Sequence, residues 1–183
     1  MPYRKASEEM IRDFDIWLFH FFNSVIKNRF LDIVMLPITI LGDRKFAFPL
    51  CLLFCIFWRR DKRRTAAILL ISLLATIGLV ELLKDLINRP RPQEVLNGIF
   101  IMGQIGLGFS FPSGHAATAF VLASVFSSAY KRFTVALFIL ATSVGISRIY
   151  LGFHYPSDVI VGAAIGTTVT YIVSKILDKF NRI

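Results

Sequence analysis

The sequence predicts an all-α fold, a polytopic transmembrane helix bundle with five or six spans and an N-terminal interfacial helix. Composition is the first reason, because 55% of the 183 residues are hydrophobic and only 18% are charged. The mean hydropathy of +0.63 is too high for an ordinary soluble domain. The second reason is that apolar residues gather in runs of about 20, the length that crosses a bilayer. The third is that basic residues stand in short clusters between these runs.

Five apolar runs are predicted to span the membrane. Four are long enough on their own: Thr65–Leu86, Ser113–Tyr130, Phe133–Ile149 and Ser157–Leu177. The fifth, Phe46–Trp58, is short, but charged residues bound it on both sides, and we expect it to span too. The chain has no internal repeat or linker, so residues 1–183 are expected to form one domain with residues 46–183 as its core bundle.

The first 45 residues leave two interpretations open. Between Phe14 and Leu41, charged and polar residues divide the sequence into two apolar pieces of about three turns each. One interpretation is an interfacial helix followed by a short inserted helix, and the other is a sixth, irregular span. Acidic residues precede the first apolar stretch and no small-residue cleavage site follows it, so a removed signal peptide is not expected.

The positions of the basic residues predict how the bundle is oriented. A net charge of +9 can indicate nucleic-acid binding, but these residues form no continuous stripe, and no nucleic-acid partner is expected. They cluster at 59–64, at 131–132 and near the C-terminus, which by the positive-inside rule marks a cytoplasmic side. The connections at 88–112 and 150–156 then face the periplasm or cell exterior. We expect a multi-pass protein of the inner (plasma) membrane.

Neither the cysteines nor the acidic residues predict a metal or redox site. Cys51 and Cys55 lie within one apolar run, and their spacing matches no redox or zinc pattern, so both are expected to be core residues. Glu81, Asp85 and Glu94 lie near polar motifs, but their spacing does not define a magnesium ligand set. No metal and no cofactor are therefore expected.

The first polar motif is Lys84-Asp-Leu-Ile-Asn-Arg-Pro-Arg91-Pro92. It begins near the outer end of a predicted span and runs into two prolines that cannot continue a helix, so Lys84 is expected one to two turns below the break. The lysine could simply extend to the interface, and Arg89 and Arg91 could bind lipid head groups nonspecifically. By itself this motif is a weak signal.

The second motif, Pro112-Ser113-Gly114-His115, begins a predicted span. A helix N-terminus offers unpaired N–H groups to an anion, Gly114 permits a close approach of the backbone, and Ser113 adds a hydroxyl donor. His115 would project from the first turn beside the same point. The alternative is an ordinary helix start with an interfacial histidine.

The third motif runs from Ser147-Arg148 to His154 and Asp158, across the end of one predicted span and the start of the next. Pro156 opens the second helix, so Asp158 is expected in its first turn, within reach of the His154 ring. A carboxylate that accepts the proton of one ring nitrogen leaves the other nitrogen as a nucleophile. The alternative is a loop histidine beside a carboxylate that favours a helix N-terminus.

The predicted topology brings all three motifs to one outer face, where charges are costly unless they are used. Together they resemble the type-2 phosphatidic-acid-phosphatase superfamily, in its branch of bacterial integral-membrane lipid phosphatases. The family's three signatures are matched at every motif position, by Lys84 with Arg91 and Pro92, by Pro112 to His115, and by Ser147, Arg148, His154 and Asp158.

The resemblance implies a metal-independent phosphoric ester hydrolase. It implies that His154 attacks the phosphorus to form a phosphohistidine, that Asp158 holds and polarises its ring, and that His115 protonates the leaving oxygen and then activates water. It also implies a cradle for the phosphoryl oxygens, formed by Lys84, Arg91, Ser113, the Gly114 backbone N–H and Arg148, with a contribution from Ser147. Such roles agree with phosphoryl transfer in general, which depends on positioning and on neutralising spread negative charge.

The expected partners are the bilayer and a lipid phosphate or diphosphate. The resemblance admits undecaprenyl diphosphate, the lipid A 1-phosphate and phosphatidylglycerol phosphate, and the motifs do not separate them. Two alternatives stay open: a lipid phosphotransferase with the same site, and a noncatalytic lipid-binding or transport protein. The connection Ile99–Phe109 is unusually apolar for a loop. It is expected either to dip into the membrane edge and admit the lipid or to pack as a cap on the bundle.

Overall fold

The computed structural model describes residues 2–57, 63–103 and 108–180, which form helices and connecting loops without any strand. The prediction of an all-α fold is confirmed. In chain order the elements are α1 (Pro2–His20), the π-helical turn η1 (Phe21–Val25), α2 (Arg29–Ile40), α3 (Arg44–Phe57), α4 (Arg63–Ile87), α5 (Pro92–Val95), α6 (Gly114–Ala129), the 3₁₀ turn η3 (Lys131–Phe133), α7 (Thr134–Tyr150) and α8 (Pro156–Phe180).

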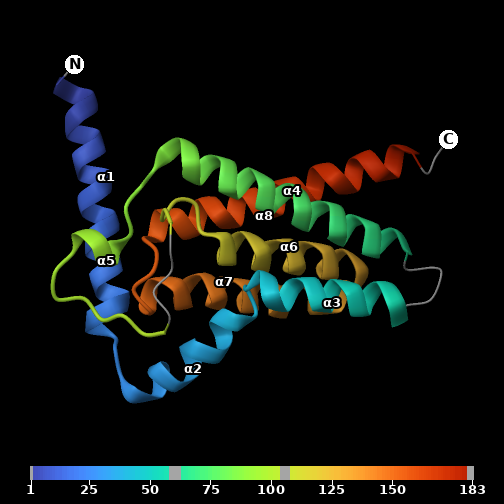
Figure 1. Cartoon of the computed structure of the whole chain (residues 1–183), viewed down its shortest axis with the longest axis horizontal. Helices are drawn as coiled ribbons and strands as arrows, with labels where there is room; N and C mark the ends of the chain where they lie inside the picture. The colour runs from blue at the N-terminus through green and yellow to red at the C-terminus, as the bar shows by residue number, and fades with distance from the viewer. Residues whose placement is uncertain (1, 58–62, 104–107, 181–183) are drawn as a thin grey trace.

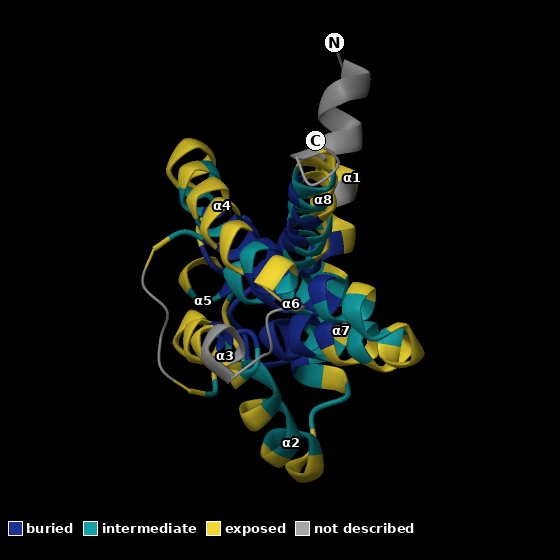
Figure 2. Ribbon diagram, turned by 90° about the vertical axis from the view of Figure 1, so that its right-hand side faces the viewer, coloured by how far each residue is buried: buried dark blue, intermediate teal, exposed yellow. Residues whose placement is uncertain are grey.

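Helix α6 lies at the centre of the bundle, with α4, α7 and α8 packed around it. In Figure 1 these helices run side by side along the long axis, and α3 follows them along one flank. Helix α6 can occupy the centre because small buried side chains, including Ala116, Ala119 and Ala123, let neighbouring backbones approach closely. In Figure 2 buried residues gather at the centre of the bundle, and exposed residues cover the outward faces of α3 and α4.

Two glycines of α8 permit its close contact with α6. A Cβ added at Gly162 would overlap the backbone carbonyl of Ser113, and one added at Gly166 would overlap that of Ala117. Small residues at such crossings are typical of membrane helices, which associate through packing and not through the hydrophobic effect. The second and third turns of α8 are thereby held against the start of α6.

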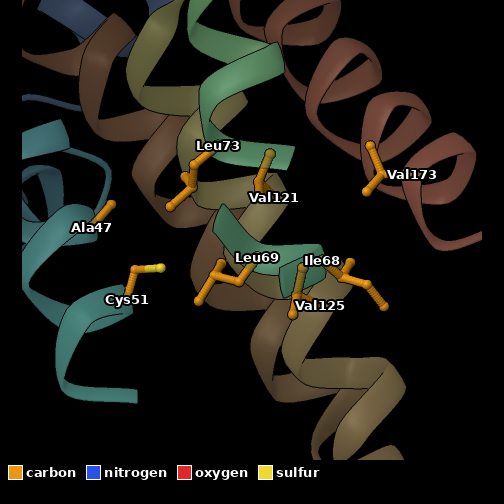
Figure 3. Close-up of a cluster of buried hydrophobic side chains, with 8 residues drawn as sticks. All are labelled: Ala47, Cys51, Ile68, Leu69, Leu73, Val121, Val125 and Val173. Atoms are coloured by element: carbon orange, nitrogen blue, oxygen red, sulfur yellow. The ribbon is translucent and has the colours of Figure 1, made fainter. Parts of the chain in front are cut away.

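The main apolar core joins four helices. It contains Ala47, Cys51, Ile68, Leu69, Leu73, Val121, Val125 and Val173, drawn from α3, α4, α6 and α8 (Figure 3). Cys51 lies in this cluster with only 2% of its surface exposed, so its prediction as a core residue is confirmed. The side chain of Cys55 lies outside the described residues.

Three segments among the described residues are long and apolar enough to cross a bilayer: Arg63–Val95, Lys131–Tyr150 and Pro156–Lys179. They contain the spans predicted at 65–86, 133–149 and 157–177. The run predicted at 113–130 forms the shorter apolar helix α6, whose 16 residues rise about 24 Å, less than the roughly 30 Å of hydrocarbon in a bilayer. The run predicted at 46–58 lies in the 14-residue α3, except for Trp58, which is outside the described residues.

The N-terminal region forms two separate helices, and neither is among the segments long and apolar enough to span. The choice between an interfacial helix followed by a short inserted helix and a sixth, irregular span stays a prediction. Helix α1 stands across the end of the bundle in Figure 1. Phe14, Trp17 and Phe21 stack along its exposed face, with ring centroids 5.9 and 6.3 Å apart. The opposite face buries Asp15 and Phe19.

Candidate active site

The three sequence motifs meet at one end of the bundle, because α4 and α7 end there and α6 and α8 begin there (Figure 1). Hydrogen bonds join the motifs directly. The Ser113 N–H donates to the Asp158 carbonyl at 2.9 Å, which joins the starts of α6 and α8. The Arg91 guanidinium donates to the Phe153 carbonyl at 3.1 Å, which joins the end of α4 to the loop that carries His154.

His154 lies in the loop before α8, and Asp158 lies in the first turn of α8. The His154 Nδ1 atom is 3.5 Å from Asp158 Oδ2. This distance is longer than a good hydrogen bond, and Nδ1 has no hydrogen-bond partner among the described residues. Catalytic hydrogen bonds are often long before substrate binds and shorten in the complex. Both side chains are buried, with 2% of His154 and none of Asp158 exposed.

Burial decides the charge of His154. The pKa of its imidazole is lowered from 6.5 to about 4, chiefly by loss of hydration and also by the positive charges of Arg148 and Arg91, against the opposing effect of Asp158. The ring is therefore neutral near pH 7. A neutral imidazole keeps one nitrogen with a free lone pair, which is the form that can act as a nucleophile.

Asp158 is held by donors from three other segments. Its Oδ2 accepts from the Tyr155 N–H at 2.9 Å and from the Ser110 hydroxyl, and its Oδ1 accepts from Arg89 at 2.7 Å. A buried carboxylate needs such donors, since an unpaired charge costs several kcal/mol to bury. The sequence motifs pointed to neither Ser110 nor this contact of Arg89.

Arg91 and Arg148 bring two buried guanidinium groups to the same end of the bundle, with 5% and 7% of their surfaces exposed. Arg91 Nε donates to the Gly108 carbonyl at 2.8 Å. Arg148 donates from one terminal nitrogen to Thr39 Oγ1 at 3.0 Å and lies over the Phe153 ring, 4.4 Å from its centroid. Its buried Nε has no partner among the described residues, so one donor stays available to an anion.

Lys84 lies in the last turn of α4, one turn below the prolines. Its Nζ is 3.6 Å from Glu81, which also binds Arg44 at 3.0 Å, and 13% of the lysine side chain is exposed. The ammonium therefore lies at the accessible margin, with the two buried arginines deeper in the protein. The contact with Glu81 is half exposed, so a phosphate dianion can compete for the lysine.

The two serines of the motifs take part in their own helices. Ser113 is the N-cap of α6 and accepts from the Ala116 N–H at 3.5 Å, and Ser147 donates to the Val144 carbonyl at 2.7 Å within α7. Helix α6 thus begins at Gly114, two residues after Pro112. A Cβ added at Gly114 would meet nothing closer than a Val80 methyl at 3.7 Å, so protein packing alone does not require glycine there.

The apolar connection before α6 has both exposed and packed side chains. Phe100 and Ile101 are 49% and 41% exposed, whereas Met102 packs against the buried cluster of Tyr150, Leu151 and Phe153. The buried side chain of Asn23 donates to the Phe100 carbonyl at 2.7 Å and accepts from the Phe100 N–H at 2.9 Å. These two hydrogen bonds hold the loop to η1. Residues 104–107 of this connection lie outside the described residues.

No group of three or more His, Cys, Asp or Glu side chains is arranged to hold a metal ion within the described part of the chain. Besides the Asp158 carboxylate, the charged groups that act on His154 are the guanidinium groups of Arg148 and Arg91, which suit a phosphate group. Two histidines, one carboxylate and three cations are thus collected at one end of a membrane bundle.

Residues 65–182 match the PAP2 superfamily, and the match covers all three motifs. The chain belongs to this superfamily. This PAP2 protein is 33% identical to a lipid A 4'-phosphatase of Bacteroides thetaiotaomicron over 86% of the chain and 74% of the relative. It is 29% identical to phosphatidylglycerophosphatase B of Bacillus subtilis, over 86% of the chain and 81% of that protein.

Two solved structures have the same fold. The crystal structure of Aquifex aeolicus LpxE superposes with a TM-score of 0.78 at 34% identity, covering 87% of this PAP2 chain and 94% of the other. The phosphatidylglycerolphosphate phosphatase of Bacillus subtilis superposes with a TM-score of 0.76 at 27% identity, covering 93% and 87%. The predicted family is confirmed, and the chain is a multi-pass membrane lipid phosphatase, a hydrolase of phosphate esters.

Proposed function

We propose that this PAP2 protein hydrolyses the phosphate ester of a membrane lipid through a phosphohistidine on His154. The observation that carries the proposal is a neutral, buried imidazole beside a buried carboxylate, with two arginines around it. A noncatalytic phosphate-binding protein needs the cations but not the pair formed by His154 and Asp158. That pair supports covalent catalysis.

In the first step, the free ring nitrogen of His154 attacks the phosphorus while the bond from phosphorus to the lipid oxygen breaks. His115 gives its proton to the leaving lipid oxygen, which departs as an alcohol, or as a lipid phosphate when the substrate is a diphosphate. In the second step, His115 takes a proton from water as the water oxygen attacks the phosphorus. The phosphorus–nitrogen bond breaks, inorganic phosphate leaves, and both histidines return to their starting states.

The cations stabilise the charge that spreads over the phosphoryl oxygens in both steps. Arg148 has an unpartnered buried Nε, Arg91 is held beside it, and Lys84 supplies a third charge from the margin. The Gly114 N–H at the start of α6 adds a backbone donor, and Ser113 and Ser147 are expected to contribute less because their hydroxyl groups bond within their helices. Donors aimed at developing charge are usually the largest catalytic factor.

The site is proposed to face the periplasm or cell exterior of the inner (plasma) membrane. The distribution of Lys and Arg among the short connections supports this orientation. The substrate class is a phosphate on a long-chain lipid, because relatives at similar identity are named for lipid A phosphatase, phosphatidylglycerophosphatase and undecaprenyl-diphosphatase activities. The exposed Phe100 and Ile101 are proposed to contact the lipid as it approaches the site.

Phosphate release from a panel of lipid phosphates in detergent tests the proposal. We expect intact protein to release phosphate and His154→Ala to lose essentially all of this activity while remaining folded. Brief reaction with substrate labelled in the phosphate should trap an alkali-stable, acid-labile phosphoprotein that His154→Ala does not form. Equal activity of the two proteins would refute the nucleophile, and label passing to an acceptor lipid without free phosphate would identify a phosphotransferase.

A further inference from the structure

A second group of buried polar side chains lies beside the motifs, and none of the motif roles accounts for it. Arg89, at the end of the first motif, donates from one terminal nitrogen to Asp158 Oδ1 and from the other to Asp15 Oδ2, each at 2.7 Å. Asp15 belongs to α1, far from the motifs in sequence and 5% exposed. The guanidinium therefore bridges two buried carboxylates, one from the N-terminal helix and one from the candidate active site.

Further contacts fix this bridge in one geometry. Ser157 donates to Asp15 through both its N–H, at 2.8 Å, and its hydroxyl, at 2.6 Å. Arg89 also donates to Ser157 Oγ at 2.7 Å and stacks over the Tyr155 ring, 4.0 Å from its centroid. Tyr155 and Ser157 lie between His154 and Asp158 in the sequence, so the hydrogen bonds of Ser157 to Asp15 and the packing of Phe19 on Tyr155 tie α1 to the start of α8.

We propose that Asp15 and Arg89 are positioning residues that orient Asp158, and that helix α1 is consequently part of the catalytic apparatus. This rests on the proposed function, in which Asp158 holds the ring of His154. Asp158 has two oxygens: Oδ1 is taken by Arg89, which directs Oδ2 toward His154 Nδ1, 3.5 Å away. Without Arg89, Oδ1 loses its donor and its nearest cation, and only Oδ2 stays held, by the Tyr155 N–H and the Ser110 hydroxyl. Both of those donors compete with His154 for Oδ2, so the orientation of the carboxylate toward the ring is less firmly fixed.

Asp15 orients the guanidinium of Arg89 by a hydrogen-bonded ion pair, as Arg89 orients the carboxylate of Asp158. An arginine that bridges two carboxylates is oriented most firmly when both nitrogens at the fork have charged acceptors. Asp15→Asn replaces a charged acceptor by a neutral amide, so the contact with Arg89 weakens and the fork is held toward Asp158 less firmly. Arg89 is 24% exposed at its side chain, and a lysine there could reach one carboxylate but not both.

Steady-state kinetics of Arg89→Gln, Arg89→Lys and Asp15→Asn test this, with a lipid phosphate and with para-nitrophenyl phosphate as substrates. Arg12→Gln and Asp13→Asn are matched controls, because those side chains are 67% and 71% exposed on the same helix. We expect Arg89→Gln to lower kcat by about 10- to 100-fold with little change in KM, since it removes orientation and not substrate binding. Asp15→Asn should lower kcat less, and Arg89→Lys should recover part of the loss.

The double variant Asp15→Asn with Arg89→Gln should be no slower than Arg89→Gln alone, because both residues act through one chain of contacts. Equal kcat for intact protein and Arg89→Gln would overturn the proposal. So would a higher KM at unchanged kcat, which would make Arg89 a substrate ligand, or multiplicative losses in the double variant. Thermal unfolding in detergent, run on each variant, separates these results from lost folding: activity is expressed per folded molecule, and a melting change without a kcat change also counts against positioning.

His154→Ala is assayed alongside these variants, so that failure of the proposed function can be distinguished from failure of the positioning inference. If intact protein releases no phosphate, or His154→Ala is as active as intact protein, the proposed function fails. If intact protein is active, His154→Ala is inactive, and Arg89→Gln matches intact protein, only the positioning inference fails.

Discussion

Gly162 of α8 lies where α8 packs against α6. The methyl group added by Gly162→Ala should push apart these two helices, which carry the two sides of the active site. A Cβ there would lie closer than 3.0 Å to the Ser113 carbonyl oxygen and 3.3 Å from the Ala116 Cβ, and both neighbours belong to the first turn of α6. The closest neighbour is backbone and cannot move aside as a side chain can. In Gly162→Ala the helices must part by roughly 1 Å, at a cost of about 1–3 kcal/mol for overpacking.

This movement reaches the chemistry because α6 carries His115 and α8 carries Asp158, with His154 just before it. The hydrogen bond from the Ser113 N–H to the Asp158 carbonyl, at 2.9 Å, joins the two helices one turn from Gly162. A misplacement of about 1 Å between reacting groups can lower a rate by roughly 100-fold. We therefore expect Gly162→Ala to lower kcat for phosphate release by about 10- to 100-fold, with a lower melting temperature in detergent.

Gly78→Ala is the matched control, since a Cβ at Gly78 in α4 would meet nothing within 4 Å. It should keep kcat within about twofold and should not lower the melting temperature, because alanine favours a helix over glycine. Phosphate release and thermal unfolding are measured on both variants in the same detergent. Wild-type kcat and melting temperature for Gly162→Ala would refute the reasoning from helix contact.

Three further outcomes are expected. Phosphate release should continue in excess EDTA, because cations of the protein surround the phosphate; loss of activity that magnesium restores would contradict this. Asp158→Asn should lower kcat by roughly 10³-fold or more, since an amide cannot stabilise the charge that forms on the ring; a loss below tenfold would remove Asp158 from its role. His154 has a folded pKa of about 4 against its ordinary 6.5, so its neutral form contributes stability above pH 6.5 that is lost as the pH falls toward 4. That loss is about 3 kcal/mol, and the melting temperature should fall less across this range in His154→Gln than in the intact protein; parallel curves would argue against it.

Local patterns were sufficient to predict the helical elements around the site. Proline and charge end the apolar runs near residues 87, 130 and 156, and the helices α4, α6 and α8 end or begin there. Pro156 marks the start of a helix, which places Asp158 in its first turn and His154 in the loop just before it. The family resemblance rests on these local features, so it was readable without coordinates.

The surroundings of a predicted span were less readable from its apolar run. The run at 113–130 is as apolar as the other spans, and it forms a 16-residue helix packed against three others. Hydropathy measures the free energy of transferring a residue out of water. It does not distinguish lipid from the interior of a protein. The small side chains of α6 were the available sign that its neighbours are helices.

By itself the sequence determined the helices, their order, the three motifs and hence the superfamily, because each depends on residues close together in the chain. Only the tertiary structure decided that Asp15 of α1 and Arg89 lie 2.7 Å apart, and that Arg89 in turn bonds Asp158 at 2.7 Å. A contact across 74 residues has no local pattern, since it depends on where α1 packs against the end of the bundle. In the sequence Arg89 is one more interfacial arginine; in the fold it lies between two buried carboxylates.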